Sequence, residues 1–357
     1  MHIAFVFNLK DDPACVEDAA EPPSDPPSEP PGSLPDDRYA EWDDIHTVRA
    51  VERALASRHQ VTLVEADLDA FETFRRLSGQ ADLVFNVAEG LHGASREGQI
   101  PALLDLLQIP YTGSDPLTLG LCLDKRRSKE ILSYNRVATP RFWIVATLGE
   151  IPRRLSYPLM VKPTLEGSSK GVTDRSLVHN FVELRRQVEW VLATYRQPAI
   201  IEEFLPGREF TVAMLGNGPG LRALPIVEIN FAALPDGASP IYSYEAKWVW
   251  DREEDPLQIF SCPADLDAAL QRGIETVCRQ AFTALGCRDW CRIDVRLDAH
   301  GHPQVIELNP LPGILPRPEQ NSCFPKAARS AGMSYDALIL TVVDTAASRL
   351  GLAREAA

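Results

Sequence analysis

The feature that most constrains the fold is an alternation of short apolar runs with amphipathic helical patterns over the first 123 residues. In the pattern at 41–58, apolar residues recur every three or four positions, at Ile45, Val48, Val51 and Leu55. The apolar runs predict strands at 2–7, 60–65 and 82–87, and the intervening patterns predict helices at 41–58, 72–77 and 96–107. Strands that alternate with helices are typical of a parallel sheet, so residues 1–123 are predicted to form an α/β unit.

The rest of the chain divides into two further units, which fits a length of 357 residues at roughly 100–200 residues per domain. The unit 124–206 is predicted to contain helices at 125–134 and 177–193, strands at 141–145, 159–162 and 199–204, and a loop at 165–172. The unit 207–357 is predicted to contain strands at 208–215, 224–229, 290–297 and 304–308, helices at 264–285 and 335–350, and an irregular segment at 230–261. We therefore predict an α/β (α+β) fold of three domains.

A segment rich in proline and acidic residues interrupts the first unit at 11–37. It includes EPPSDPP at 21–27, which has little apolar surface to bury and few backbone donors for a strand. We expect a mobile surface loop in this segment.

Charge and composition exclude several classes of function. The formal net charge of −14 argues against a nucleic-acid partner, because phosphate backbones require a basic face. The seven cysteines are scattered and lack CxxC spacing, so we expect free thiols and no zinc site. No signal peptide and no apolar run long enough to cross a membrane occurs, which favours a cytoplasmic enzyme with no membrane partner.

The first candidate site is the loop EGSSKG at 166–171, which follows a strand containing Lys162. Its glycines permit tight turns, and its serines and backbone N–H groups can contact phosphate oxygens beside the charge of Lys162. The GxxxxGK[ST] sequence of P-loop enzymes is absent, and no GxGxxG of a nicotinamide-dependent dehydrogenase follows the first strand. By itself, the loop is also compatible with an exposed hairpin.

The second candidate site combines Arg292 and Asp294 with Glu307 and Asn309. Each pair lies in a strand-like segment, where residues two apart share a face. If the two faces coincide, two carboxylates and an amide oxygen converge, and such hard oxygen ligands suit Mg²⁺. Charged pairs on an exposed strand are the alternative interpretation.

Taken in order along the chain, these motifs and several others resemble the ATP-grasp superfamily, and within it the D-alanine–D-alanine ligase family. The likeness covers about residues 82–340. Its motifs are IPYTGS (109–114), LDK (123–125), VKP (161–163), EGSS (166–169), IEEF (201–204), GREFTV (207–212), YEAK (244–247), CPA (262–264), LGC (285–287), RID (292–294), IELN (306–309) and PG (312–313). Each motif is short, but coincidence does not account for so many in one order.

The resemblance implies a three-domain ATP-grasp fold and an ATP site. The residues implied to bind the nucleotide are Lys125, Lys162, Ser169, Glu202, Glu203, Phe204, Leu205 and Glu209. Among them, the two lysines would bind the phosphates and Glu209 would meet the ribose. Two Mg²⁺ ions, with Mn²⁺ as an alternative, would be held by Asp294, Glu307 and Asn309.

The resemblance also implies catalytic and substrate residues. The catalytic set would be Ser168, Lys247, Arg292 and Gly313, and the substrate set would be His92, Glu97, Trp248 and Ser322. Lys247 would reach the γ-phosphate from a closing loop, while Arg292 and the Gly313 backbone would stabilise an oxyanion.

Three departures from the family pattern bear on the substrate. The family usually has a glycine-rich turn after the first strand, with an acid that holds the first substrate's amino group, whereas FNLK occupies residues 7–10 here. Glu41 and Asp43 are the candidates for that acid. Trp248 stands where the family commonly has Tyr, and residues 316–319 form a short insertion before Ser322.

We therefore expect an ATP-dependent carboxylate–amine ligase that forms an acyl phosphate, joins it to an amine, and releases ADP and phosphate. Its partners would be small amino-acid or peptide substrates, and we expect a homodimer. D-alanine–D-alanine ligase is one alternative. A nucleotide-binding protein that has lost ligase activity is another, but the retained Lys125, Arg292 and Glu307 argue against it.

Overall fold

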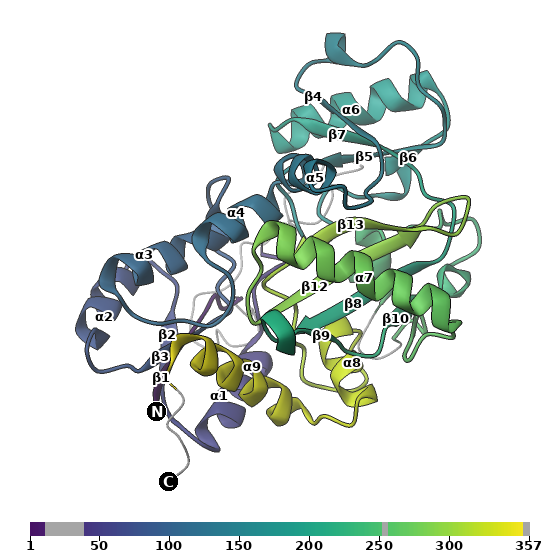
Figure 1. Cartoon of the computed structure of the whole chain (residues 1–357). Helices are drawn as coiled ribbons and strands as arrows, with labels where there is room; N and C mark the ends of the chain where they lie inside the picture. Colours follow the sequence, from purple (N-terminus) through teal and green to yellow (C-terminus); the bar gives the residue numbers. More distant parts are fainter. Residues whose placement is uncertain (11–38, 252–255, 353–357) are drawn as a thin grey trace, which may run out of the picture.

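The computed structural model describes residues 1–10, 39–251 and 256–352. The segment 11–37, predicted to be a mobile loop, lies outside these ranges. Three sheets organise the described chain, and each draws its strands from one continuous stretch of sequence (Figure 1). No helix in the described ranges is long and apolar enough to span a membrane.

The N-terminal sheet has the order β2-β1-β3, and its strands are parallel as predicted. Its elements are β1 (His2–Phe7), α1 (Ile45–Ala56), β2 (Gln60–Glu65), α2 (Ala70–Leu77), β3 (Leu83–Asn86), a 3-10 turn (Arg96–Gly98), α3 (Gln99–Leu107) and α4 (Pro116–Leu123). The prediction that the first helix begins at residue 41 is wrong. The helix begins at Ile45, because the Asp44 side chain accepts the Thr47 N–H and caps it. Glu41 and Asp43 therefore stand outside the helix.

The central sheet is antiparallel and has the order β4-β7-β5-β6. Its elements are α5 (Lys125–Tyr134), β4 (Phe142–Val145), β5 (Leu159–Pro163), β6 (Leu177–Val178), α6 (Phe181–Tyr195) and β7 (Ala199–Glu203). The predicted helix at 177–193 is wrong at its start. The first two residues pair with β5, and Asn180 then caps the helix by accepting the N–H groups of Val182 and Glu183.

The C-terminal sheet is antiparallel, with the order β11-β10-β8-β12-β13 and β9 paired to β8. Its elements are β8 (Glu209–Leu215), β9 (Arg222–Ala223), β10 (Val227–Ile229), β11 (Phe260–Ser261), α7 (Ala268–Leu285), β12 (Trp290–Leu297), β13 (Pro303–Asn309), α8 (Cys323–Ser330) and α9 (Tyr335–Leu350). Short 3-10 turns lie at Leu148–Glu150, Asp174–Ser176, Gly218–Gly220 and Phe231–Ala233, and a π-helix lies at Glu245–Trp250.

The two faces of β12 have different partners. Cys291, Ile293 and Val295 are fully buried in the cluster that contains the apolar side of α7. Because side chains alternate along a strand, Arg292 and Asp294 leave from the opposite face. The packing of α7 therefore fixes which side of the sheet carries the polar residues.

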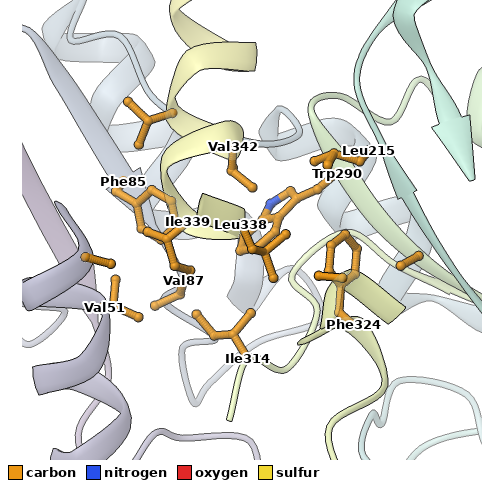
Figure 2. Packing of buried hydrophobic residues seen from close by; sticks show 14 of the residues in the cluster. Val51, Phe85, Val87, Leu215, Trp290, Ile314, Phe324, Leu338, Ile339 and Val342 are labelled. Atoms are coloured by element: carbon orange, nitrogen blue, oxygen red, sulfur yellow. The ribbon is translucent and has the colours of Figure 1, made fainter. Parts of the chain in front are cut away.

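The last helix, α9, lies against α1 of the N-terminal unit (Figure 1). Figure 2 shows the cluster between them, in which Val51 and Phe85 of the N-terminal unit meet Ile339, Val342 and Trp290. One core thus joins the first and last parts of the chain and sets the position of the N-terminal sheet relative to β12.

Candidate active site

A cavity of about 420 Å³ lies where the three units meet. It brings together side chains from the strands of the central and C-terminal sheets and from helices and loops of all three units. The predicted site residues that line it are Glu97, Lys125, Lys162, Ser168, Ser169, Glu202, Glu203, Phe204, Leu205, Glu209, Lys247, Trp248, Arg292, Asp294, Glu307, Asn309, Gly313 and Ser322. His92 is exposed and does not line the cavity, so its contact with the substrate stays a prediction. The Gln99 side chain instead holds its backbone carbonyl at 2.8 Å.

The carboxylates of β12 and β13 come together as expected for coinciding faces. Asp294 is the direct partner of Glu307 across the strands, and Arg292 is the partner of Asn309. The Arg292 guanidinium lies 3.0 Å from Asp294 and 3.8 Å from Glu307. Lys125 approaches the other Glu307 oxygen at 3.2 Å.

The pKa values of the two carboxylates are shifted in opposite directions. Burial opposes ionisation of Glu307, but Lys125, Lys162 and Arg292 outweigh it, so its pKa is well below the ordinary value. Burial and the adjacent Glu307 raise the pKa of Asp294 despite Arg292. Two carboxylates and the Asn309 amide form a hard oxygen set that fits Mg²⁺, so these residues could hold the metal.

Lys162 is held by a buried ion-pair network. Glu202 of β7 contacts Lys162 and also lies 2.6 Å from Lys129 of α5. Burial opposes the charge on Glu202, but the two lysines lower its pKa to about 2. Burial likewise disfavours the charged form of Lys162, yet Glu202 and Glu307 raise its pKa. Glu202 therefore orients Lys162, which was predicted to bind phosphates. The Glu202 carboxylate, predicted to contact adenine, is engaged by the two lysines.

The loop between β5 and β6 has an unusual backbone. Ser168 and Ser169 have φ angles of 49° and 61°, a left-handed conformation that non-glycine residues adopt at an energetic cost. The Ser169 hydroxyl donates to the Tyr242 carbonyl at 2.9 Å, and the Lys125 ammonium donates to the Glu166 carbonyl. These contacts hold the loop over the cavity, where a phosphate-covering role requires it.

The π-helix carries Lys247 and Trp248 to the same loop. Lys247 Nζ lies 3.3 Å from Ser168 Oγ, and Trp248 Nε1 donates to the Ser168 carbonyl at 3.1 Å. Burial, together with the charge of Arg292, lowers the pKa of Lys247 to about 8. Trp248 thus hydrogen-bonds to the Ser168 backbone, and Lys247 contacts the Ser168 hydroxyl.

Phe204 and Leu205, predicted to bind the nucleotide, line the cavity. The Arg296 guanidinium lies over the Phe204 ring, 4.6 Å from its centroid, and pairs with Glu209 at 2.8 Å. An aromatic ring, an apolar side chain and an oriented carboxylate suit a purine and a ribose. Arg296 stands two residues beyond Asp294 on β12 and lines the same cavity.

A turn that contains Gly313 lines the cavity together with Ser322, which was predicted to bind the substrate. The Ser322 hydroxyl donates to the Gly313 carbonyl at 3.0 Å and accepts from the Leu315 N–H at 3.2 Å. Glu97 also lines this cavity, where burial and the nearby Glu41 raise its pKa to about 8.

Of the two candidate N-terminal acids, Glu41 is fully engaged. Both of its oxygens accept from Arg96, at 2.9 and 3.2 Å, and Lys170 lies 2.8 Å away. Arg96 also donates to the Leu165 carbonyl at 2.9 Å, which ties the N-terminal unit to the loop between β5 and β6. Asp43 lines the cavity as Glu41 does, but no side-chain hydrogen bond or ion pair of Asp43 is found within the described ranges.

Sequence reasoning missed Arg96, Lys129 and Lys170. Two of them had a signal, because Lys129 lies one helical turn after Lys125 and Lys170 stands inside the EGSSKG loop. Arg96 and Lys170 both pair with Glu41, which lies 55 and 129 residues before them in the chain. No local sequence pattern connects residues so far apart.

The family model described as the D-ala D-ala ligase C-terminus matches residues 132–344. A D-alanine–D-alanine ligase of Bordetella pertussis is 36% identical over 300 residues, which cover 81% of this chain and 88% of that protein. The chain belongs to the D-alanine–D-alanine ligase family. It is therefore an ATP-dependent ligase that forms C–N bonds and releases ADP.

Two further relatives and one solved structure are similar to most of this chain. The D-alanine–D-alanine ligase of Bordetella petrii is 35% identical over 302 residues, covering 82% of this chain and 86% of that protein. An uncharacterised protein of Sinorhizobium fredii, y4sG, is 35% identical over 297 residues, covering 82% and 84%. The structure of a Bacillus anthracis D-alanine–D-alanine ligase complexed with ATP has a TM-score of 0.70 at 24% identity, covering 99% of this chain and 98% of that chain. The predicted ATP-grasp fold is thereby confirmed.

Proposed function

We propose that this ligase activates the carboxylate of one amino-acid-like substrate as an acyl phosphate and joins it to the amino group of a second. The observation that carries the proposal is the convergence of Lys125, Lys162, Lys247 and Arg292 around Asp294 and Glu307 in one cavity. Several cations beside a hard-ligand set suit transfer of a phosphoryl group.

In the first step, a carboxylate oxygen attacks the γ-phosphorus of ATP and the bond to the ADP oxygen breaks. Lys125 and Lys162 would hold the phosphates, and Lys247 would approach the transferred group from the π-helix. When bound by Asp294, Glu307 and Asn309, Mg²⁺ would neutralise charge that develops on the phosphoryl oxygens.

In the second step, the amine nitrogen attacks the carbonyl carbon, the C–O bond to phosphate breaks, and the nitrogen loses a proton. Arg292 and the Gly313 N–H would donate to the oxyanion that forms at the carbonyl. Trp248 and Lys247 of the π-helix both bond to Ser168 in the loop between β5 and β6. Held together in this way, the loop and the π-helix would keep water from the acyl phosphate.

A second candidate function is D-alanine–D-alanine ligase itself. It is favoured by the names of the Bordetella relatives, which are 35–36% identical over most of their length. The two candidates share every chemical step and differ only in the substrates.

The experiment is a screen for nucleotide products with ATP, Mg²⁺ and amino acids of both configurations, singly and in pairs. We expect ADP and orthophosphate to appear only with productive substrates. AMP and pyrophosphate as the main products would refute the acyl-phosphate route. D-alanine with itself as the fastest pair would select the second candidate.

A further inference from the structure

Lys10 stands at the carboxyl end of β1, the middle strand of the N-terminal sheet. Its N–H donates to the Asp43 carbonyl at 2.9 Å, and Asn8 braces the same turn by accepting the Gly90 N–H at 2.9 Å. In the order β2-β1-β3, the strands β2 and β3 lie on opposite sides of β1, so the strand order reverses at the carboxyl end of β1. Parallel sheets usually bind ligands at such a point. The lysine side chain lines the cavity from this fixed turn.

The Lys10 ammonium has no carboxylate at ion-pair distance among the residues that the structure describes. Its Nζ is 3.4 Å from the Ala40 carbonyl and 4.9 Å from the centroid of the Trp248 ring. Lys247 Nζ lies 5.2 Å from the same centroid. One indole therefore contacts both the lysine proposed to act at the phosphoryl group and Lys10, so Lys10 lies close to the reacting centre.

The neighbouring acids offset this charge only in part. The Asp44 carboxylate caps α1 and accepts the Thr47 N–H at 2.7 Å. Burial and the charge of Asp44 raise the pKa of Asp43 to about 7, so Asp43 is only partly ionised near neutral pH. Burial also lowers the pKa of Lys10, which an incoming anion would reverse.

We propose that Lys10 is a specificity-determining residue that binds an additional carboxylate of the substrate, distinct from the one that is activated. The inference rests on the proposed function, because it assumes amino-acid-like substrates in this cavity. The additional carboxylate belongs either to an acidic side chain or to the C-terminus of a peptide. An ammonium in a partly buried cavity forms a strong charge-assisted hydrogen bond with either group.

The test compares matched substrates by ADP release in the wild type and in Lys10→Met. The first two pairs are aspartate against asparagine and glutamate against glutamine, each with alanine as the second substrate. The third pair is alanyl-alanine against its C-terminal amide, each supplying the amine to activated alanine, so that the dipeptide's carboxylate is not the one that reacts. All are tested in both configurations. We expect the wild type to favour the charged member of at least one pair by about tenfold or more in kcat/KM. In Lys10→Met this ratio should fall about 10- to 100-fold, chiefly through KM. The responsive pair identifies the source of the carboxylate.

Two variants control the test. Lys10→Arg retains the charge and should retain the preference, which separates charge loss from damage to the fold. Lys326→Met removes the same charge from α8, outside the cavity lining, and should leave the preference unchanged. A wild-type preference for the neutral members, or the same ratio in Lys10→Met as in the wild type, would overturn the role of Lys10.

Failure of the proposed function has a different signature. If no substrate pair releases ADP, the ligase proposal fails, and Lys10 is then tested by calorimetric titration of glutamate, glutamine and the dipeptide in the presence of ADP. Binding of a charged ligand that weakens about tenfold or more in Lys10→Met supports the inference. Equal binding to both proteins refutes it.

Discussion

Asp294 and Glu307 are direct cross-strand partners on β12 and β13, so their carboxylates leave the same face of the sheet. Arg292 contacts both, and Lys125 contacts Glu307. The strand register thus concentrates two acids and two cations at the proposed site of phosphoryl transfer. This pairing leads to the first of four predictions.

Asp294→Asn and Glu307→Gln should each lower the rate of ADP release by about 100-fold or more, because each removes a charged oxygen from the proposed metal set. Thermal unfolding should remain cooperative, since both changes preserve shape. Glu189→Gln, on the exposed side of α6, is the matched control and should behave as the wild type. Near-normal rates for both site variants at ordinary Mg²⁺ would rule out the metal assignment.

The rate should depend on the protonation of Lys247. Its pKa is lowered to about 8 by burial and by Arg292, while Cys323, Glu41 and Glu307 act in the opposite direction. Only the charged form can neutralise the phosphoryl group, so kcat/KM should fall as pH rises through about 8. Lys247→Arg should lose this alkaline limb even if its maximum rate is lower. A wild-type profile that stays flat from about pH 7 to 9 would contradict the assignment.

Glu202→Gln should destabilise the protein and weaken ATP binding. The change leaves Lys129 and Lys162 buried without their shared counter-charge, which costs about 3–5 kcal/mol in the free energy of unfolding. The KM for ATP should rise because Lys162 loses its orientation. Chemical denaturation of the single variant and of Glu202→Gln/Lys129→Met measures the coupling. A double variant no more stable than the single one would show that the ion pair with Lys129 is not what stabilises this region.

D-alanine should be a poor substrate in both positions. Trp248 stands where the family commonly has Tyr, and its indole N–H can donate to Ser168 but cannot accept a hydrogen bond. Glu41 is already paired with Arg96 and Lys170. Unpaired buried groups cost about 1–3 kcal/mol each, so a site with altered partners should favour a bulkier or differently functionalised substrate. Steady-state rates across substrate pairs decide this, and D-alanyl-D-alanine synthesis faster than every other tested pair would contradict it.

Local sequence patterns determined most of the individual elements. The predicted bounds of β2, α5 and α9 match the structure, because each is a strongly periodic segment bounded by its own caps or turns. The helices α4 and α8 were missed; in α4, PLTLGLCL, the apolar residues follow one another without a helical period. The start of α6 was misassigned because Leu177 and Val178 pair with β5, a contact that their local sequence does not encode.

The order of short motifs along the chain determined the family and most of the residues that line the cavity. Tertiary structure alone decided how those residues are used. It placed Glu202 between two lysines, engaged Glu41 with Arg96, left His92 outside the cavity and brought Lys10 against Trp248. The physical reason is that ion pairs and cavity walls form between residues far apart in sequence, after packing has fixed the sheets. A linear pattern records which groups are present, but only the packed chain sets the distances between them.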